Sequence, residues 1–357
     1  MDEKNIQEVP FKGIFLEKYK KIRKQKIKEK RIEFSKQKSK IRIGIEKEIE
    51  KDQKHRDLVN MCIFPFCSPG KVTKLGYRFI MAEPLAELGA KNFDFLIYNK
   101  ENNVALFGEV KGSVSDPRRT VSETEERIDI VKEHMEYISE NYLGELPSYV
   151  EYIIGLYAAD DEKVIREIHR RESRIIVWSI DRYNSILSPK TLRDDEKMAI
   201  KVGVLHRDAS LINAVKNVKT SHKVFEIFSS SHIFSLMRII LLAKTTIDEG
   251  DLILTEKDLM EFVKGELSYL DNSTQEKKVK IILNMAESIG FLRRIDAETF
   301  KIVSRSKMNK SLEKDLKRKY VKYTERKQLR TIIEEATFEA QKEVEEERER
   351  VSLEKWL

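Results

Sequence analysis

The sequence predicts an α/β core with a mixed central sheet, preceded by a helical arm and followed by a second unit of helices and a hairpin. Three features predict this architecture. Residues 12–43 are dominated by lysine and arginine, short apolar runs alternate with helical patterns over residues 58–187, and an apolar helix starts a new pattern after residue 221. A chain of 357 residues has room for two or three domains of ordinary size.

The composition narrows the classes of protein to consider. Charged residues make up 36% of the chain, well above the usual quarter, and a net charge of +7 with a pI near 9.0 favours a polyanionic partner. The two cysteines, Cys62 and Cys67, have no histidine pair beside them, which argues against a four-ligand zinc site. The N-terminus lacks an apolar signal core, and no apolar run reaches the roughly 18 residues that span a bilayer. We therefore expect a cytoplasmic protein with no membrane contact.

The first predicted domain is a basic helical arm, residues 1–57. Residues 12–43 hold fourteen lysines and arginines against three glutamates, and the isoleucines between them are too sparse for a good amphipathic stripe. A long, mostly solvated helix or helix pair is therefore expected. Two roles remain open: an arm with no specific partner, and an arm that contacts phosphates, since clustered basic side chains displace counterions from a duplex.

The predicted core spans residues 58–187. A helix over Tyr77–Leu88 is expected to stop at Gly89, and two strands, Phe93–Tyr98 and Val104–Val110, are joined by the turn sequence NKENN. The later elements are a helix over Glu123–Asn141, a strand over Tyr149–Tyr157, a helix over Asp160–Arg171 and a strand over Arg174–Ile180. This alternation predicts an α/β layer with a mixed sheet.

The strand VALFGEVK carries the residues that point to chemistry. Glu109 and Lys111 are two residues apart on an apolar strand, so both point to the same face. Asp94 lies on the preceding strand, and the turn between the strands would bring it near Glu109. Two carboxylates at close range repel, and a divalent cation relieves that repulsion. We therefore expect Asp94, Glu109 and the Val110 carbonyl to hold Mg²⁺, with Mn²⁺ as a substitute, and Lys111 to orient or help deprotonate a water. A surface hairpin with an ordinary ion pair is the alternative.

This spacing resembles the motif of a known family. Asp94, fourteen intervening residues and the run Glu109–Lys111 resemble the PD-(D/E)xK nuclease superfamily, and the order of elements in about 65–187 is similar to its core. The resemblance covers about a third of the chain and implies a restriction-endonuclease-like fold that hydrolyses phosphodiester bonds. Family members often carry another acidic residue on the helix before the first motif strand, where Glu83 stands, with Glu87 as a rival. Phe93 departs from the pattern, because it stands where the name-giving proline would be.

A linker over 188–220 and a second unit over 221–305 are expected to follow. The helices of that unit are predicted over Ile233–Ala243, Thr255–Leu267 and Thr274–Ile289, and its strands over Phe291–Ile295 and Thr299–Val303. Three helices followed by a hairpin are typical of a winged helix-turn-helix. Its third helix and wing are then expected to contact DNA through Thr274, Gln275, Lys277, Lys278, Arg293 and Arg294. Docking of a protein is the alternative role, and residues 306–357 are predicted as a charged helical tail.

The leading interpretation is a Mg²⁺-dependent endodeoxyribonuclease of restriction or defence type that acts on double-stranded DNA. A homodimer is expected, because two-fold symmetry matches the two strands of a duplex. Arg118 and Arg119, just after the motif strand, are expected either to bind phosphates of the cleaved strand or to form a plain polar loop. Two alternatives remain: a structure-selective repair or recombination nuclease, and a non-catalytic DNA-binding protein with a nuclease-like core.

Overall fold

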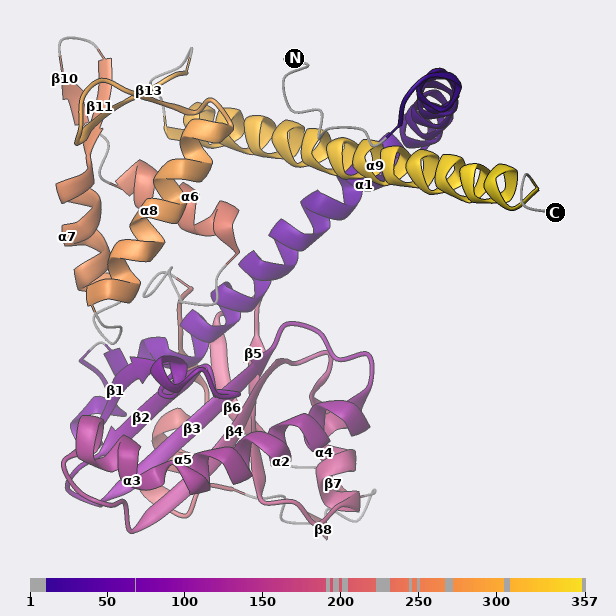
Figure 1. Cartoon of the computed structure of the whole chain (residues 1–357). Helices are drawn as coiled ribbons and strands as arrows, with labels where there is room; N and C mark the ends of the chain where they lie inside the picture. Colours follow the sequence, from indigo (N-terminus) through magenta and orange to yellow (C-terminus); the bar gives the residue numbers. More distant parts are fainter. Residues whose placement is uncertain are drawn as a thin grey trace.

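The chain is arranged as a sheet-centred core, a second unit with a smaller sheet, and a projecting pair of long helices (Figure 1). The helix α1 (Ile14–Cys67) runs through all three parts. The computed structural model describes residues 11–67, 69–190, 193–194, 199–200, 205–222, 232–243, 246–248, 251–266, 272–304 and 309–354.

A mixed seven-stranded sheet forms the centre of the core, in the order β1-β2-β3-β4-β5-β6-β9. The first three strands and the last three are antiparallel, whereas β3, β4 and β5 are parallel. The strands are β1 (Tyr77–Ala82), β2 (Phe95–Asn99), β3 (Val104–Lys111), β4 (Tyr149–Tyr157), β5 (Ile175–Asp181), β6 (Ile186–Lys190) and β9 (Val218–Lys219). The expectation of an α/β protein with a mixed central sheet is confirmed.

Helices cover both faces of this sheet. The inner end of α1, from Leu58 to Phe66, and α5 (Ala209–Val215) pack on one face, where Trp178 stacks between Phe66 and Phe95 at ring separations of 5.4 and 5.9 Å. The other face is covered by α2 (Pro117–Glu133), α3 (Met135–Ile138) and α4 (Asp161–Arg170), with a π-helical turn, η3 (Ser139–Leu143), after α3. The catalytic candidates therefore lie in the middle layer of an α-β-α sandwich.

The predicted helix over Tyr77–Leu88 is wrong. Residues 77–82 form the edge strand β1, which follows the short 3₁₀ turn η1 (Thr73–Leu75) and pairs antiparallel with β2. The positive φ expected at Gly89 is present, at 64°, but it ends only the 3₁₀ turn η2 (Ala86–Leu88). Tyr, Phe and Ile suit a strand, and the partner strand β2 decides between the two states.

The range predicted as a linker, 188–220, contributes to the core. It holds the end of β6, the helix α5 and the edge strand β9, so the sheet continues to Lys219. Two short strands, β7 (Arg193–Asp194) and β8 (Ala199–Ile200), pair with each other. The core boundary expected at residue 187 is therefore too early.

The second unit contains three helices and a four-stranded antiparallel sheet in the order β10-β11-β13-β12. Its elements are α6 (Ile233–Ala243), β10 (Thr246–Asp248), β11 (Asp251–Thr255), α7 (Glu256–Glu266), α8 (Asn272–Ser288), β12 (Leu292–Arg294) and β13 (Thr299–Ile302). The three helices and the final hairpin match the predicted positions, whereas β10 and β11 were not expected. Ile45 and Ile49 of α1 and Leu316 of the last helix share its apolar core.

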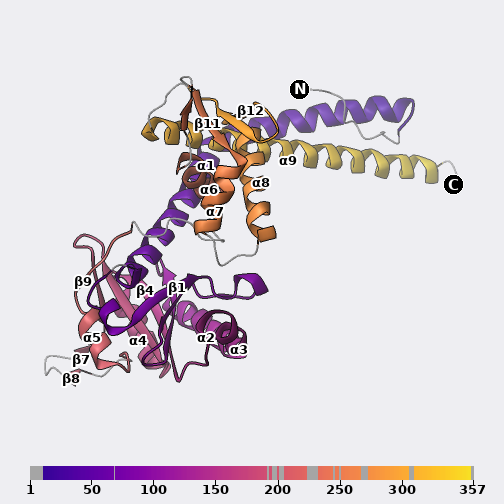
Figure 2. The same cartoon turned by 90° about the vertical axis from the view of Figure 1, so that its left-hand side faces the viewer.

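The predicted charged tail is one helix, α9 (Asn309–Glu354), that lies along the outer half of α1 (Figure 2). Near the tip of the pair, Phe11 and Tyr19 pack with Ala340 and Val344 of α9. The arm and the tail, expected as separate segments, are therefore partners. No helix in the described part of the chain combines the length and the apolar character needed to cross a membrane.

Candidate active site

Asp94 is held in place by its backbone at the start of β2. Its N–H donates to the carbonyl of Gly108 on β3 at 2.8 Å, and its own carbonyl accepts from the N–H of Glu83 at 3.2 Å. The close approach of β2 and β3 here depends on Gly108, since a Cβ at that position would lie 1.8 Å from the ring of Phe95. The sheet therefore fixes Asp94 between β1 and β3.

The carboxylate of Asp94 accepts a hydrogen bond from β3 beyond the point where the pairing of β3 with β2 ends. Pairing of β2 with β3 ends at Gly108, and the N–H of Val110 donates to Oδ2 of Asp94 at 2.6 Å. The N–H and C=O of one strand residue point to the same side. The Val110 carbonyl therefore faces the side on which Asp94 lies.

Glu109 is buried beside two cations. Its side chain is 6% exposed, and Oε1 lies 2.7 Å from Nζ of Lys111 and 3.4 Å from Nη2 of Arg127. Burial and the charge of Asp94 raise the pKa of Glu109 to about 7, although Lys111 and Arg127 act in the opposite direction. The expected approach of Asp94, Glu109 and Lys111 is therefore found.

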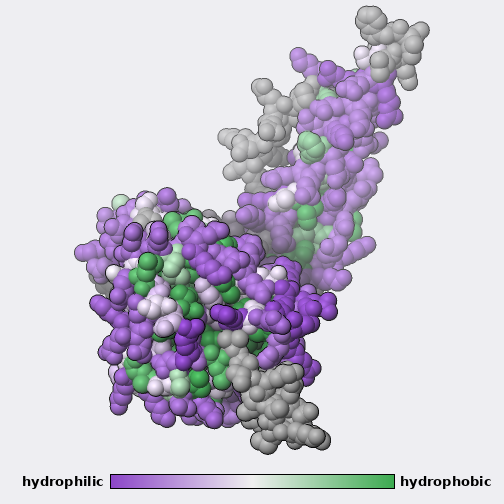
Figure 3. Space-filling model, turned by 90° about the horizontal axis from the view of Figure 1, so that it is seen from below, coloured by the Kyte–Doolittle hydropathy of each residue, from purple (hydrophilic) through white to green (hydrophobic). Residues whose placement is uncertain are grey.

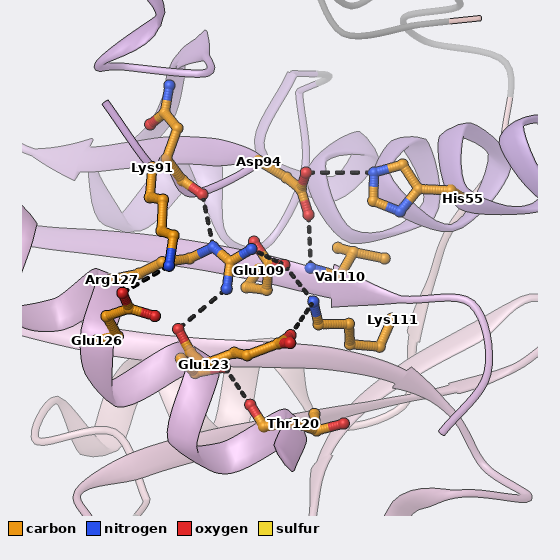
Figure 4. A network of polar contacts seen from close by, with 12 residues as sticks. His55, Lys91, Asp94, Glu109, Val110, Lys111, Thr120, Glu123, Glu126 and Arg127 are labelled. Carbon is orange, nitrogen blue, oxygen red and sulfur yellow. Dashed lines mark hydrogen bonds and ion pairs between the residues drawn. The ribbon is translucent and has the colours of Figure 1, made fainter. Parts of the chain in front are cut away.

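His55, which sequence reasoning missed, joins the site from α1. Its Nε2 lies 3.2 Å from Oδ1 of Asp94 (Figure 4). Burial alone would lower the pKa of His55, but the carboxylates of Asp94 and Glu109 outweigh it and raise the pKa to about 9. Leu58, which follows one turn later, faces the sheet. Leu58 marks the face of α1 that meets the sheet, but the sequence carries no signal that this face passes beside the motif strand.

Two residues of α2 complete the polar network (Figure 4). Glu123 lies 3.6 Å from Nζ of Lys111. Arg127 donates to the carbonyls of Asn92 and Glu123, each at 3.0 Å, in addition to its contact with Glu109. These contacts hold Lys111 and Glu109 in place. Glu123 and Arg127 lie on the same face of α2, because they are four positions apart.

A cleft of about 980 Å³ opens beside this network. Its walls are α1, the end of β3 with the loop after it, and His232. Glu109, Val110 and Lys111 form one side, and the other side carries the lysines Lys47, Lys51 and Lys54 with the glutamates Glu48 and Glu50. A phosphate that entered the cleft would meet Lys111 and the basic side chains of α1.

Glu83 contacts Asp94 through its backbone N–H, whereas its charge acts on a residue of the second unit. It follows β1 with a φ of 51°, is 7% exposed, and its charge acts on Lys278 of α8. The expected helix that would carry Glu83 is absent from this segment, since β1 occupies it. Its rival Glu87 accepts a hydrogen bond from the hydroxyl of Tyr137 at 2.9 Å.

The remaining predicted residues lie on three surfaces. Arg118 is exposed at the start of α2, and Arg119 is paired with Glu123 at 2.7 Å. On α8, Gln275 is 3% exposed, Thr274 and Lys278 are half-buried, and Lys277 is exposed. On β12, Arg293 is exposed, whereas Arg294 lies 4.5 Å above the ring of Phe300. Gln275 therefore does not present its amide to a base in this arrangement, contrary to expectation.

The oxygen donors available for a metal are few. The described residues contain no group of three or more His, Cys, Asp or Glu side chains placed to hold an ion. The carboxylates of Asp94 and Glu109 and the carbonyl of Val110 are the set that the strands bring to one place. Two carboxylates and water are sufficient for Mg²⁺, which keeps much of its hydration shell in proteins.

Comparison with known proteins adds no family to this geometry, because no family model, curated protein or solved structure matches the chain.

Proposed function

We propose that this protein is a Mg²⁺-dependent endodeoxyribonuclease with a restriction-endonuclease-like core. The observation that carries the proposal is the meeting of Asp94, Glu109 and Lys111 where the β2–β3 pairing ends. The mixed sheet supports it, since Asp94 and the run Glu109–Lys111 lie at neighbouring antiparallel strands and α2 follows β3. The phosphodiester bonds of DNA are the proposed substrate.

The residues at this place suit a hard divalent cation. The negative charges of Asp94 and Glu109 repel each other. The pKa of Glu109, about 7, reflects burial together with that repulsion. Mg²⁺, or Mn²⁺ in its place, would be held by these two carboxylates and the Val110 carbonyl. When bound, the ion polarises a phosphate oxygen and lowers the pKa of a coordinated water.

The protein side chains have distinct roles in the proposed reaction. Lys111 stabilises the negative charge that develops on the phosphate and orients the attacking water. Glu123 of α2 holds the ammonium group of Lys111 in position. Arg127 partly balances the negative charge of the buried Glu109 before the substrate enters. His55 fixes the orientation of the Asp94 carboxylate through the 3.2 Å contact.

We also propose that the second unit is a winged helix-turn-helix that positions DNA. The support is the sequence of α6, α7 and α8 followed by the β12–β13 hairpin, with β11 joined to β13. Because Gln275 is buried and Lys278 lies beside Glu83, the start of α8 faces the core. This favours a structure-selective nuclease as the second candidate, since base reading needs an accessible recognition helix.

Cleavage of DNA by the purified chain tests the proposal. Supercoiled plasmid, linear duplex and branched DNA are incubated with Mg²⁺, and we expect cleavage of at least one. Asp94→Ala and Lys111→Ala should each lower the rate by about 10²-fold or more, because each removes a group that acts at the reacting phosphate. Lys91→Ala is the matched control, since Lys91 pairs with Glu126 on the surface nearby.

Three outcomes separate the candidates. Discrete bands from duplex DNA support a restriction-type enzyme, and selective cutting of branched DNA supports the structure-selective one. Equal nicking by Asp94→Ala, Lys111→Ala and the unmodified chain would refute the site. Intact DNA in every reaction would leave the non-catalytic DNA-binding protein as the better description.

A further inference from the structure

The outer half of α1 carries one set of lysines that α9 neutralises. Nζ of Lys26 lies 3.1 Å from Glu343, and Nζ of Lys30 lies 3.6 Å from Glu339. Lys18 and Lys38 are paired in the same way, with Glu347 and Glu325. The pairing runs antiparallel, so the acidic residues of α9 compensate the side of α1 that they contact.

A second set of side chains, most of them basic, lies on a different side of the same helix. Its members recur at intervals of three and four residues, which places them on one face. They border a groove of about 840 Å³, and we call them the basic face: Lys20, Arg23, Lys24, Ile27, Lys28, Arg31, Ile32, Ser35 and Lys36. Six of these nine side chains are cationic and none is acidic.

The basic face is available to a partner. Lys24, Lys28, Arg31 and Lys36 are exposed, and within the described part of the chain the structure records no ion pair for them. Lys20 pairs with Glu17 at 2.8 Å, and Arg23 donates to the hydroxyl of Thr337. The projecting helix pair is mainly hydrophilic on the side seen in Figure 3.

We infer that the basic face binds the sugar–phosphate backbone of a nucleic acid duplex outside the catalytic cleft. This inference takes the nucleic acid from the proposed function, but binding by the arm does not require cleavage. A row of six cations, four of them exposed and without a recorded ion pair in the described residues, matches the regular phosphate charge of a duplex. The lysines of α1 that face α9 are neutralised by its glutamates, so the electrostatic attraction for phosphates comes from the basic face.

The geometry of α1 sets the length of duplex involved. His55 at the cleft and Lys24 on the basic face lie 31 residues apart on one continuous helix. At about 1.5 Å per residue, their separation is at most about 46 Å. A duplex rises about 3.4 Å per base pair, so about 14 base pairs cover that distance.

A lipid surface suits the basic face less well. A helix that lies in a membrane interface needs a broad apolar face, and here Ile27 and Ile32 are the two apolar side chains among nine. They are also separated by five positions, so they form no continuous apolar strip. The observations therefore favour a nucleic acid.

The test measures binding in EDTA, where cleavage cannot contribute. Dissociation constants for labelled duplexes of 8 and 30 base pairs are determined over a series of salt concentrations. The triple variant Lys24→Gln, Lys28→Gln and Arg31→Gln should bind the longer duplex at least about 10-fold more weakly. Its slope of log affinity against log salt should be smaller by about 2 to 3, since each lost phosphate contact removes about 1.

A control with the same loss of charge comes from the core. Lys71, Lys74 and Lys100 are exposed at or near the β2–β3 turn, at the end of β2 opposite Asp94. Replacing these three lysines by glutamine should leave the salt slope unchanged. Circular dichroism of both triples should equal that of the unmodified chain, because every substitution is on the surface.

The outcomes are distinguishable from those of the cleavage test. Equal slopes for the two triples would overturn the inference, and so would stronger binding of the basic face to anionic phosphatidylserine vesicles than to DNA. If the slopes differ as expected while Mg²⁺ produces no cleavage, the proposed nuclease activity fails and the inference stands. If cleavage occurs but the slopes are equal, only the inference fails.

Discussion

Asp94 connects the strands, the motif and the long helix through a single side chain. Its backbone is hydrogen-bonded to Glu83, directly after β1, and to Gly108 of β3, and its carboxylate contacts the N–H of Val110 and the ring of His55. The pKa shifts of Glu109 and His55 both arise partly from its charge. At the scale of single residues, the site is therefore organised around Asp94, while Glu109 is the more buried carboxylate, with 6% of its side chain exposed against 17% for Asp94.

The close contact at Gly108 predicts a strong effect of one methyl group. Gly108→Ala would place Cβ 1.8 Å from the ring of Phe95, so the β2–β3 pair must separate or Phe95 must leave its rotamer. We expect a destabilisation of about 3 kcal/mol or more, measured by urea unfolding.

Gly44 provides the matched control, because it lies inside α1 and a Cβ there would meet nothing within 4 Å. Gly44→Ala should stabilise the chain by about 0.5 to 1 kcal/mol through helix propensity. Similar effects of the two substitutions would contradict the packing at Gly108.

At the scale of elements, α1 is attached to the second unit by a buried polar cluster. Asp52 accepts from the hydroxyl of Ser235 at 2.5 Å, from the N–H of His232 at 2.8 Å and from Arg56 at 3.0 Å. The side chain of Arg56 is only 3% exposed. Asp52 lies one turn before His55 and Arg56 directly after it, so the cluster fixes the rotation of α1 that points His55 to Asp94.

The cluster predicts a dependence of stability on pH. Burial alone would raise the pKa of Asp52, but the hydrogen bonds from Ser235 and His232 and the charge of Arg56 outweigh it and lower the pKa from its ordinary value. A carboxyl whose folded pKa is lowered stabilises the fold above its unfolded pKa. That contribution is lost as the pH falls through the folded pKa. Lowering the pH should therefore reduce the free energy of unfolding of the unmodified chain by the contribution of ionised Asp52. The Asp52→Asn variant lacks that contribution and should not show this loss.

Asp52→Asn should also cost about 3 kcal/mol at pH 7, because it leaves Arg56 buried without its carboxylate. Chemical unfolding at pH 7 and at pH 3 measures both effects. Glu48→Gln, an exposed position one turn earlier on α1, should be neutral within about 0.5 kcal/mol. An equal loss of stability with pH in Asp52→Asn and the unmodified chain would contradict the assignment.

The elements that the sequence could predict are those with a local signal. The strands β3 and β4 are mainly apolar runs, and the shared face of Glu109 and Lys111 follows directly from their two-residue spacing on β3. The strand β1 was predicted as a helix because its state depends on pairing with β2. His55 was missed because nothing in its neighbourhood along the chain indicates that α1 passes beside the end of β3. Likewise, the partner of the arm is about 300 positions away in the sequence.

At the scale of the whole molecule, the core and the second unit meet at Glu83 and the start of α8. Glu83 is 7% exposed, and its charge raises the pKa of Lys278, although burial outweighs that effect and lowers it. Ala86, in the turn after Glu83, packs against the apolar core of the second unit. The acidic residue that the motif would assign to the metal therefore lies at the contact between the two units.

A double-mutant cycle separates these two roles of Glu83. If it joins the units, Glu83→Gln and Lys278→Gln should each destabilise the chain, and the double variant should lose about 1 kcal/mol less than the sum. Mn²⁺ affinity, measured by paramagnetic broadening, should be unchanged in Glu83→Gln and reduced in Asp94→Asn. Additive effects together with a loss of Mn²⁺ affinity in Glu83→Gln would instead place Glu83 at the metal. In that case the second unit would have to move away from the core before the site could form.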